Sequence, residues 1–251
     1  MQRKPFLPEM EQFRDTAIKF FQKEIAPHKE RWREQRIVDR EAFLKAGEMG
    51  FLCMWADEEY GGLGLKDFRY EQILVEENAN HGDSGYFITL HSRLVGPYIE
   101  KFATEEQKQR FIPGMITGEI ILAIAMTEPD AGSDLAGMKT HAEKVGDEWV
   151  LNGSKTYISN GINADVIIVA AKTNPDNPHA MTLFLVERGM EGFERGRNLK
   201  KMGLKSQDTA ELFFNDVKLS EKNVLGKVDG GFYHLMVGLA EERLIAACGN
   251  V

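Results

Sequence analysis

The sequence predicts an α+β protein of several domains: an N-terminal α-helical domain, a middle antiparallel β domain and the start of a C-terminal helical domain. Apolar residues recur at helical spacing over residues 1–119, whereas short apolar runs separated by turn residues fill residues 120–230. Helical spacing returns over residues 231–251. This order differs from the alternation of strands and helices in a doubly wound parallel sheet.

The composition is that of a folded protein with an excess of acidic residues. Of the 251 residues, 43% are hydrophobic and 28% are charged, and 31 Lys and Arg against 39 Asp and Glu leave a net charge of −8. The negative charge argues against a nucleic-acid-binding protein and against adsorption to anionic membranes. The longest apolar run, residues 120–126, is far shorter than a membrane-spanning segment. Cys53 and Cys248 are too few for a disulfide framework, which indicates a reducing compartment.

Two apolar stripes predict helices in the N-terminal part. The first consists of Phe13, Ala17, Phe20, Phe21 and Ile25, and the second of Phe87, Leu90, Leu94, Tyr98 and Phe102. Asp39 can cap the helix that follows it, and Thr104 with Gln107 forms a capping box at the start of another. That second helix should end near Pro113.

Short apolar runs and turn signals predict the strands of the middle domain. The run at residues 120–126 suits a buried strand, and further runs follow at residues 166–171, 181–186 and 212–214. Asn152-Gly153 indicates a hairpin turn, because both residue types tolerate the positive φ of a type I′ turn. After residue 231 the helical pattern still continues where the sequence stops at Val251.

Several familiar catalytic and binding motifs do not occur in the sequence. Gly61-Gly-Leu-Gly64 does not complete a dinucleotide-binding fingerprint, and there is no phosphate-binding loop, His-Glu-x-x-His motif or serine-hydrolase elbow. The six histidines and two cysteines lack metal-ligand spacing, so we expect no metal site. Residues 1–5 have no apolar core behind them, unlike a signal peptide.

The most informative segment is residues 125–134, where the predicted buried strand leads into a loop. Pro129 and Gly132 shape the loop, and small residues allow a backbone to approach a ligand closely. Thr127, Ser133 and Asp134 add polar groups just beyond the apolar strand. On these residues alone, a ligand-binding loop and an ordinary polar loop both remain open.

Four ordered motifs resemble those of the acyl-CoA dehydrogenase family. Thr-Glu-Pro-Asp-Ala-Gly-Ser-Asp at residues 127–134 is similar to the first family signature, and residues 152–161 are similar to the second flavin segment. Residues 59–64 and 201–211 resemble further family segments, so the resemblance covers nearly the whole chain. The long-chain subgroup is the most similar, since it shares Ala-Met-Thr-Glu-Pro, Gln-Asp-Thr-Ala-Glu-Leu-Phe-Phe and a Gly-Phe-Tyr stretch before Glu-Arg-Leu.

The resemblance implies an FAD enzyme with a helical domain, a β domain and a C-terminal four-helix bundle, of which this chain would hold only the first helix. FAD would lie between the β domain and the bundle. Thr127 would hydrogen-bond the flavin ring and Tyr157 would shield it. The implied cofactor contacts are Ile124, Ala125, Met126, Thr127, Gly132, Ser133, Tyr157, Ile158 and Ser159. The implied substrate contacts are Ser133, Tyr233, Ala240, Glu241, Glu242 and Arg243.

The implied reaction oxidises an acyl-CoA to its trans-2-enoyl-CoA. A carboxylate takes the α-proton while the β-hydrogen leaves as hydride to flavin N5. Long-chain and isovaleryl types carry the base just before an arginine on the first C-terminal helix, which corresponds to Glu242 before Arg243. Most other members carry it in the C-terminal domain, beyond Val251, so both positions stay open. Glu241 is one residue away and faces about 100° round the helix, so we expect it not to act as the base.

The resemblance also implies partners and a location. The substrate would be an acyl-CoA, the electron acceptor an electron-transfer flavoprotein, and the assembly a homotetramer. The location would be a bacterial cytoplasm or, in a eukaryote, the mitochondrial matrix. Two alternatives remain: a flavin oxidase or monooxygenase on the same fold, and a fragment without catalytic activity.

Overall fold

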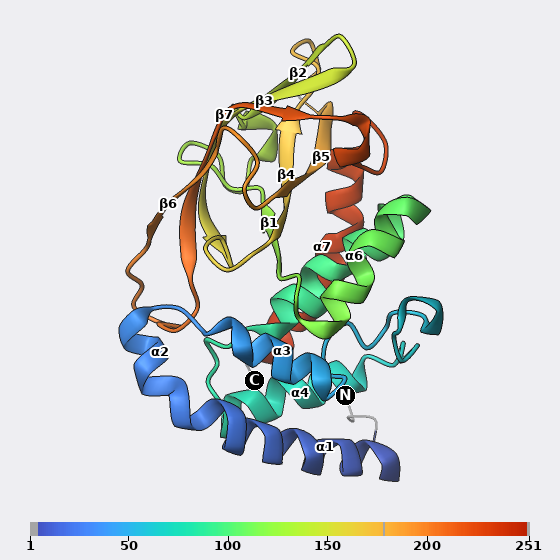
Figure 1. Cartoon of the computed structure of the whole chain (residues 1–251), viewed down its shortest axis with the longest axis vertical. Coiled ribbons are helices and arrows are strands. Elements are labelled where there is room, and N and C mark those ends of the chain that lie inside the picture. Colours follow the sequence, from blue (N-terminus) through green and yellow to red (C-terminus); the bar gives the residue numbers. More distant parts are fainter. Residues whose placement is uncertain (1–4, 178, 250–251) are drawn as a thin grey trace.

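The computed structural model describes residues 5–177 and 179–249, and Figure 1 shows a twisted sheet at one end and a layer of helices at the other. The signal-peptide prediction rests on residues 1–5, of which residues 1–4 lie outside the described residues, as do residues 178, 250 and 251. None of the helices in the described ranges reaches the length and apolarity that crossing a bilayer demands.

The N-terminal part is helical, as predicted. Its α-helices are α1 (Pro8–Phe20), α2 (Lys29–Gln35), α3 (Arg40–Glu48), α4 (Arg69–His81), α5 (Gly96–Phe102) and α6 (Glu105–Thr117). Shorter helical turns are η1 (Phe21–Ile25), η2 (Ala26–His28), η3 (Glu58–Tyr60) and η4 (Leu90–Val95). The capping box at Thr104 and Gln107 is present: the Gln107 amide N–H donates to the Thr104 hydroxyl at 3.2 Å and the Thr104 amide N–H to the Gln107 side chain at 2.9 Å.

The middle part is one mixed sheet that is mostly antiparallel. Its strands are β1 (Leu122–Ala125), β2 (His141–Val145), β3 (Glu148–Ser159), β4 (Val166–Lys172), β5 (Met181–Glu187), β6 (Phe193–Asn198), β7 (Thr209–Leu219) and β8 (Val224–Leu225). They run in the order β6-β7-β3-β2-β4-β5-β8, and β1 pairs with β4 in parallel. The pairing of β2 with β4 is parallel as well, so two pairs depart from the antiparallel pattern. The informative loop follows the end of β1.

A final helix, α7 (Gly231–Gly249), joins the two layers. It starts against β5 and continues past η4 and α5 to α4, and Figure 1 shows it descending from the sheet into the helical layer. Leu235, near its start, is fully buried in the core between sheet and helices. Side chains along β4 point alternately to the two faces of the sheet. Ile168 therefore packs in this core, whereas Ile167 packs in a second core on the other face.

Three local predictions are wrong. Asn152-Gly153 lies inside β3, and the turn between β2 and β3 falls instead at Gly146, whose φ is 63°. Helix α6 continues through Pro113 to Thr117, because buried side chains on both sides of the proline pack against the core and outweigh its local cost. Asp39 precedes α3 but does not cap it, because its carboxylate binds Arg31.

Candidate active site

The loop after β1 is held against the middle of β3. Met126 and Thr127 are half-buried where the strand ends, and the Thr127 carbonyl accepts a hydrogen bond from the Thr156 amide at 2.9 Å. This contact places residues 126–128 beside residues 155–157. The two segments that resemble flavin-binding motifs therefore meet where the loop after β1 lies beside β3.

A bulge in β3 turns Tyr157 outward. The register between β3 and β7 shifts between Lys155 and Ile158, and Tyr157 adopts a left-handed φ of 59°. Such a conformation costs about 1 kcal/mol or more for a residue with a side chain, and bulges of this kind are common near active sites. The Tyr157 ring is 69% exposed while Ile158 is buried, so the bulge presents one aromatic ring on an otherwise packed strand.

A buried ion pair fixes the loop and the bulge to each other. The Lys155 ammonium, fully buried, donates to Glu128 at 2.8 Å and to the Met126 carbonyl at 3.0 Å. Glu128 also accepts from the amides of Lys139 and Thr140, at 2.6 and 3.0 Å. Burial lowers the pKa of Lys155 to about 8. Burial opposes ionisation of Glu128 too, but the charge of Lys155 and these hydrogen bonds keep the pKa of Glu128 below its usual value.

The nine expected cofactor residues fall into three groups by exposure. Ala125 and Ile158 point into the core behind the sheet, so only their backbone can face a ligand on the other side. The half-buried residues are Ile124, Met126, Thr127 and Ser159, and the exposed ones are Gly132, Ser133 and Tyr157. Within the described part of the chain, the hydroxyls of Thr127, Ser133 and Ser159 form no hydrogen bond. The segment thus combines an exposed ring with unused hydroxyls, which suits a planar polar ligand.

On α7, Glu242 has one close polar partner among the residues that the structure describes. The Tyr98 hydroxyl donates to Glu242 Oε1 at 2.6 Å. Burial raises the pKa of Glu242, and the Tyr98 hydrogen bond and the charge of Arg243 oppose part of that rise. Gly238 makes the contact possible, because a Cβ there would lie 2.2 Å from the Tyr98 oxygen. A carboxylate that holds its proton more tightly than usual is well suited to accept one from carbon.

The neighbouring Glu241 has different partners. It forms ion pairs with Arg93 of η4 and, at 3.1 Å, with Lys101 of α5. Glu71 of α4 is buried close to the charges of Arg93 and Glu241, and burial raises the pKa of Glu71 to about 7. Glu241 thus ties α7 to the N-terminal helices, whereas Glu242 meets a neutral hydroxyl.

Two hollows lie alongside α7. The first is narrow, with room for about one water at about 10 Å³, and its lining includes Tyr98, Gly238, Glu241 and Glu242. The second is a cavity of about 310 Å³ between α4 and the end of α7. Apart from Asn78, Ser84 and Thr89 its lining is apolar: Leu74, Val75, Ala79, Phe87, Ile88, Leu204, Ile245, Ala246 and Gly249. Ile245 lies one helical turn beyond Glu242, so both hollows share one face of α7.

Of the remaining expected substrate residues, Tyr233, Ala240 and Arg243 are exposed on α7. Sequence reasoning missed Tyr98 and Gly238 as neighbours of Glu242, and it missed the Lys155–Glu128 pair. Tyr98 was identified only as one member of an apolar stripe, and its partner lies 144 residues away. Lys155 had no signal at all, because a lysine in a polar segment normally indicates a solvated position.

Two family models match most of the chain. Acyl-CoA dehydrogenase, N-terminal domain, covers residues 8–119, and Acyl-CoA dehydrogenase, middle domain, covers residues 123–217. The chain belongs to the acyl-CoA dehydrogenase family. The resemblance carried by the four sequence motifs is thereby confirmed, and the matched ranges agree with the helical and sheet layers of the fold.

Relatives of known sequence and structure agree with this family membership. The long-chain specific acyl-CoA dehydrogenase of Sus scrofa is 49% identical over 98% of this chain, and the isovaleryl-CoA dehydrogenase of Pongo abelii is 39% identical over 96%. A crystal structure of acyl-CoA dehydrogenase from Geobacillus kaustophilus is 49% identical over 99% of this chain, with a TM-score of 0.95. The chain spans 57% of the Sus scrofa relative, 58% of the Pongo abelii relative and 66% of the Geobacillus chain.

Proposed function

We propose that this chain is part of an FAD-dependent acyl-CoA dehydrogenase that converts an acyl-CoA thioester to its trans-2-enoyl-CoA. The observation that carries the proposal is Glu242, a half-buried carboxylate whose pKa burial raises, on the same face of α7 as an apolar cavity of about 310 Å³. The proposed domains are residues 1–119, 120–230 and 231–251, with α7 as the first helix of a C-terminal helical domain.

In this proposal Glu242 removes the α-proton of the thioester. An α-C–H beside a thioester is a weak acid, so the base must be close and must bind the proton tightly. Partial burial of Glu242 provides the proton affinity, and the Tyr98 hydrogen bond holds the carboxylate in one orientation. When bound, FAD would accept the β-hydrogen as hydride.

The loop after β1 and the bulge in β3 would hold the flavin. The Thr127 hydroxyl would hydrogen-bond it, the loop backbone around Ser133 would contact it, and the exposed ring of Tyr157 would cover it from water. Ile124, Ala125, Met126, Gly132, Ile158 and Ser159 would complete the contact, with Ala125 and Ile158 contributing backbone only. The Lys155–Glu128 pair would keep the two segments in register.

The apolar cavity would take the acyl chain, because its lining offers hydrocarbon and few polar groups. The CoA portion would lie along Ser133, Tyr233, Ala240, Glu241 and Arg243. The exposed Arg243 guanidinium suits a phosphate oxygen.

The electron acceptor would be an electron-transfer flavoprotein and the assembly a homotetramer. A solved structure described as the electron transferring flavoprotein of Acidaminococcus fermentans contains a chain 35% identical to this one, with a TM-score of 0.92, and this likeness supports the choice of acceptor. The mammalian relatives are described as mitochondrial, which supports a matrix location if the source is a eukaryote and a bacterial cytoplasm otherwise.

The test uses the full-length protein that contains this chain. A visible spectrum reports bound flavin, and anaerobic addition of butyryl-, isovaleryl-, octanoyl- and palmitoyl-CoA should bleach it with at least one chain length. A yellow protein that none of a wider panel of acyl-CoAs bleaches would contradict the proposal. Rapid oxygen consumption by the reduced protein would favour a flavin oxidase on the same fold.

A further inference from the structure

A hollow with charged walls adjoins the apolar cavity between α4 and α7. Its volume is about 510 Å³, and it is bordered by α2, by the loop after α4 and by the segment that links β6 to β7. We refer to it as the polar hollow, because charged side chains of both signs line it: Glu30, Arg33, Glu34, Asp83 and Lys205. The apolar cavity has no charged side chain among the described residues that line it.

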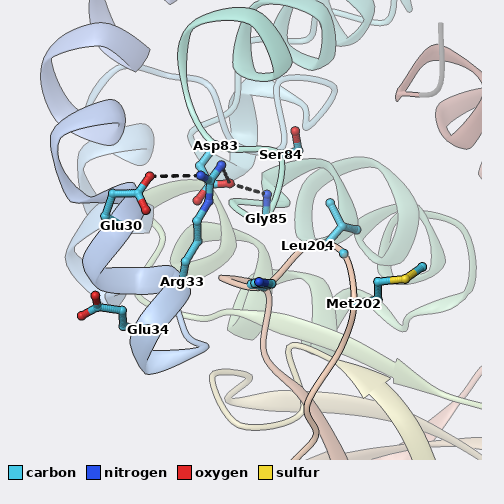
Figure 2. Close-up of a pocket in the computed structure, with 10 residues that line it drawn as sticks. Glu30, Arg33, Glu34, Asp83, Ser84, Gly85, Met202 and Leu204 are labelled. Carbon is cyan, nitrogen blue, oxygen red and sulfur yellow. Dashed lines mark hydrogen bonds and ion pairs between the residues drawn. The ribbon is translucent and has the colours of Figure 1, made fainter.

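Ser84 and Leu204 line both spaces. Figure 2 shows these two residues on the side of the polar hollow that lies away from Glu30 and Glu34 of α2. Leu204 is 49% exposed, so part of its side chain is open to the polar hollow while the rest borders the apolar cavity. The two residues therefore form a wall between a cavity lined by hydrocarbon and a hollow lined by charges.

Buried contacts hold this wall in place. The Ser206 hydroxyl donates to the Asp83 carboxylate at 2.8 Å, and both side chains are buried. The Gln207 amide donates to the Leu204 carbonyl at 3.0 Å. Gly85 permits this close approach of the two segments, because a Cβ there would overlap the Ser206 hydroxyl. The backbone of Leu204 is thus fixed against the loop that follows α4.

The wall borders a different part of the molecule from the proposed base. Among the described residues, the narrow hollow beside Glu242 and the polar hollow have no lining residue in common. Ile245 lies one helical turn beyond Glu242 and lines the apolar cavity. An acyl chain whose thioester lies at Glu242 would therefore pass Ile245 before it reached Leu204.

We propose that Leu204 ends the acyl cavity and thereby sets the longest acyl chain that the enzyme oxidises efficiently. This proposal rests on the proposed function. Each methylene that enters the apolar cavity strengthens binding about fourfold. A methylene that passes Leu204 would instead meet the charged groups of the polar hollow, where burial of hydrocarbon gains little and desolvates those groups. The substrate class is therefore acyl-CoAs with an apolar chain that ends before Leu204.

The test changes the size of residue 204 in the full-length protein. Leu204→Ala removes about three carbon atoms from the wall, and Leu204→Phe enlarges it. Met202→Ala is the matched control, because Met202 is 98% exposed and lines the polar hollow but not the apolar cavity. For each protein kcat/KM is measured with the straight-chain series from butyryl-CoA to stearoyl-CoA. The small dye dichlorophenolindophenol accepts the electrons, so that the result does not depend on a protein acceptor.

We expect kcat/KM of the wild type to rise with chain length to an optimum and then to fall. Leu204→Ala should move the optimum to a longer chain. For the first substrate beyond the wild-type optimum, its kcat/KM relative to butyryl-CoA should rise about fourfold or more, which corresponds to at least one further buried methylene. Leu204→Phe should move the optimum to a shorter chain, and Met202→Ala should leave it where it is.

Two results would overturn the proposal. In the first, Leu204→Ala keeps the wild-type optimum. In the second, Met202→Ala moves the optimum as far as Leu204→Ala does, which would assign the effect to the whole segment and not to the wall. Failure of the proposed function is distinct, since then no acyl-CoA of the series would bleach the flavin of the wild type.

Discussion

Replacing Lys155 with methionine should destabilise the protein by about 3 kcal/mol and loosen the proposed flavin loop. Methionine fills a similar length but removes the ammonium that neutralises Glu128, whose side chain is only 4% exposed. Breaking one partner of a buried ion pair typically costs ~3–5 kcal/mol. The two amides that still donate to Glu128 make the lower end of that range appropriate here.

The assay is urea unfolding of the full-length wild type, Lys155→Met, Glu128→Gln and the double variant. Because the double variant leaves no unpaired buried charge, we expect it to be more stable than Lys155→Met. We also expect Lys155→Met to bind FAD more weakly, since the Met126 carbonyl loses its donor. A change below about 0.5 kcal/mol in Lys155→Met, together with additive effects in the double variant, would refute the reasoning.

Three further changes test other contacts. Gly238→Ala should displace the Tyr98 hydroxyl and slow flavin reduction by acyl-CoA, and an unchanged rate would show that the contact does not matter. Tyr98→Phe removes a hydrogen bond that lowers the pKa of Glu242, so the acidic limb of the pH–rate profile should move to higher pH. Burial lowers the pKa of His91 from its usual 6.5 to about 4, so the unfolded chain binds this proton first as the pH falls. His91 should therefore contribute a loss of about 2 kcal/mol between pH 7 and pH 5, which buried Glu71 opposes because its raised pKa of about 7 favours the folded state as the pH falls. In urea unfolding, His91→Gln should remove the His91 contribution, so that stability at pH 5 relative to pH 7 is higher in the variant than in the wild type.

Local patterns in the sequence predicted the elements well. The apolar stripes and the Thr104 capping box depend on residues within one or two helical turns, and the structure contains them as predicted. For these features the determining contacts lie close together in the sequence. The apolar run at residues 120–126 contains β1, as its composition predicted, but the partner strand β4 lies far along the chain and could not be assigned from the run itself.

The wrong predictions arise where contacts with residues distant in the sequence determine the local conformation. Asn152-Gly153 can form a turn, but pairing of β3 with both β2 and β7 keeps the segment extended. Pro113 would end an isolated helix, but packing of the flanking side chains keeps α6 intact. The partner of Lys155 lies 27 residues away, so no local pattern identified the pair.

The central claim is that Glu242 is the base, and one measurement tests it most directly. Glu242→Gln and Glu241→Gln are made in the full-length protein, and the anaerobic rate of flavin bleaching by a saturating acyl-CoA is measured by stopped flow. An amide cannot take the α-proton, so Glu242→Gln should bind FAD normally and lose ~10²–10⁴-fold or more in rate, while Glu241→Gln should lose little. Near wild-type bleaching in Glu242→Gln, together with an essential glutamate in the C-terminal region beyond residue 251, would contradict the account.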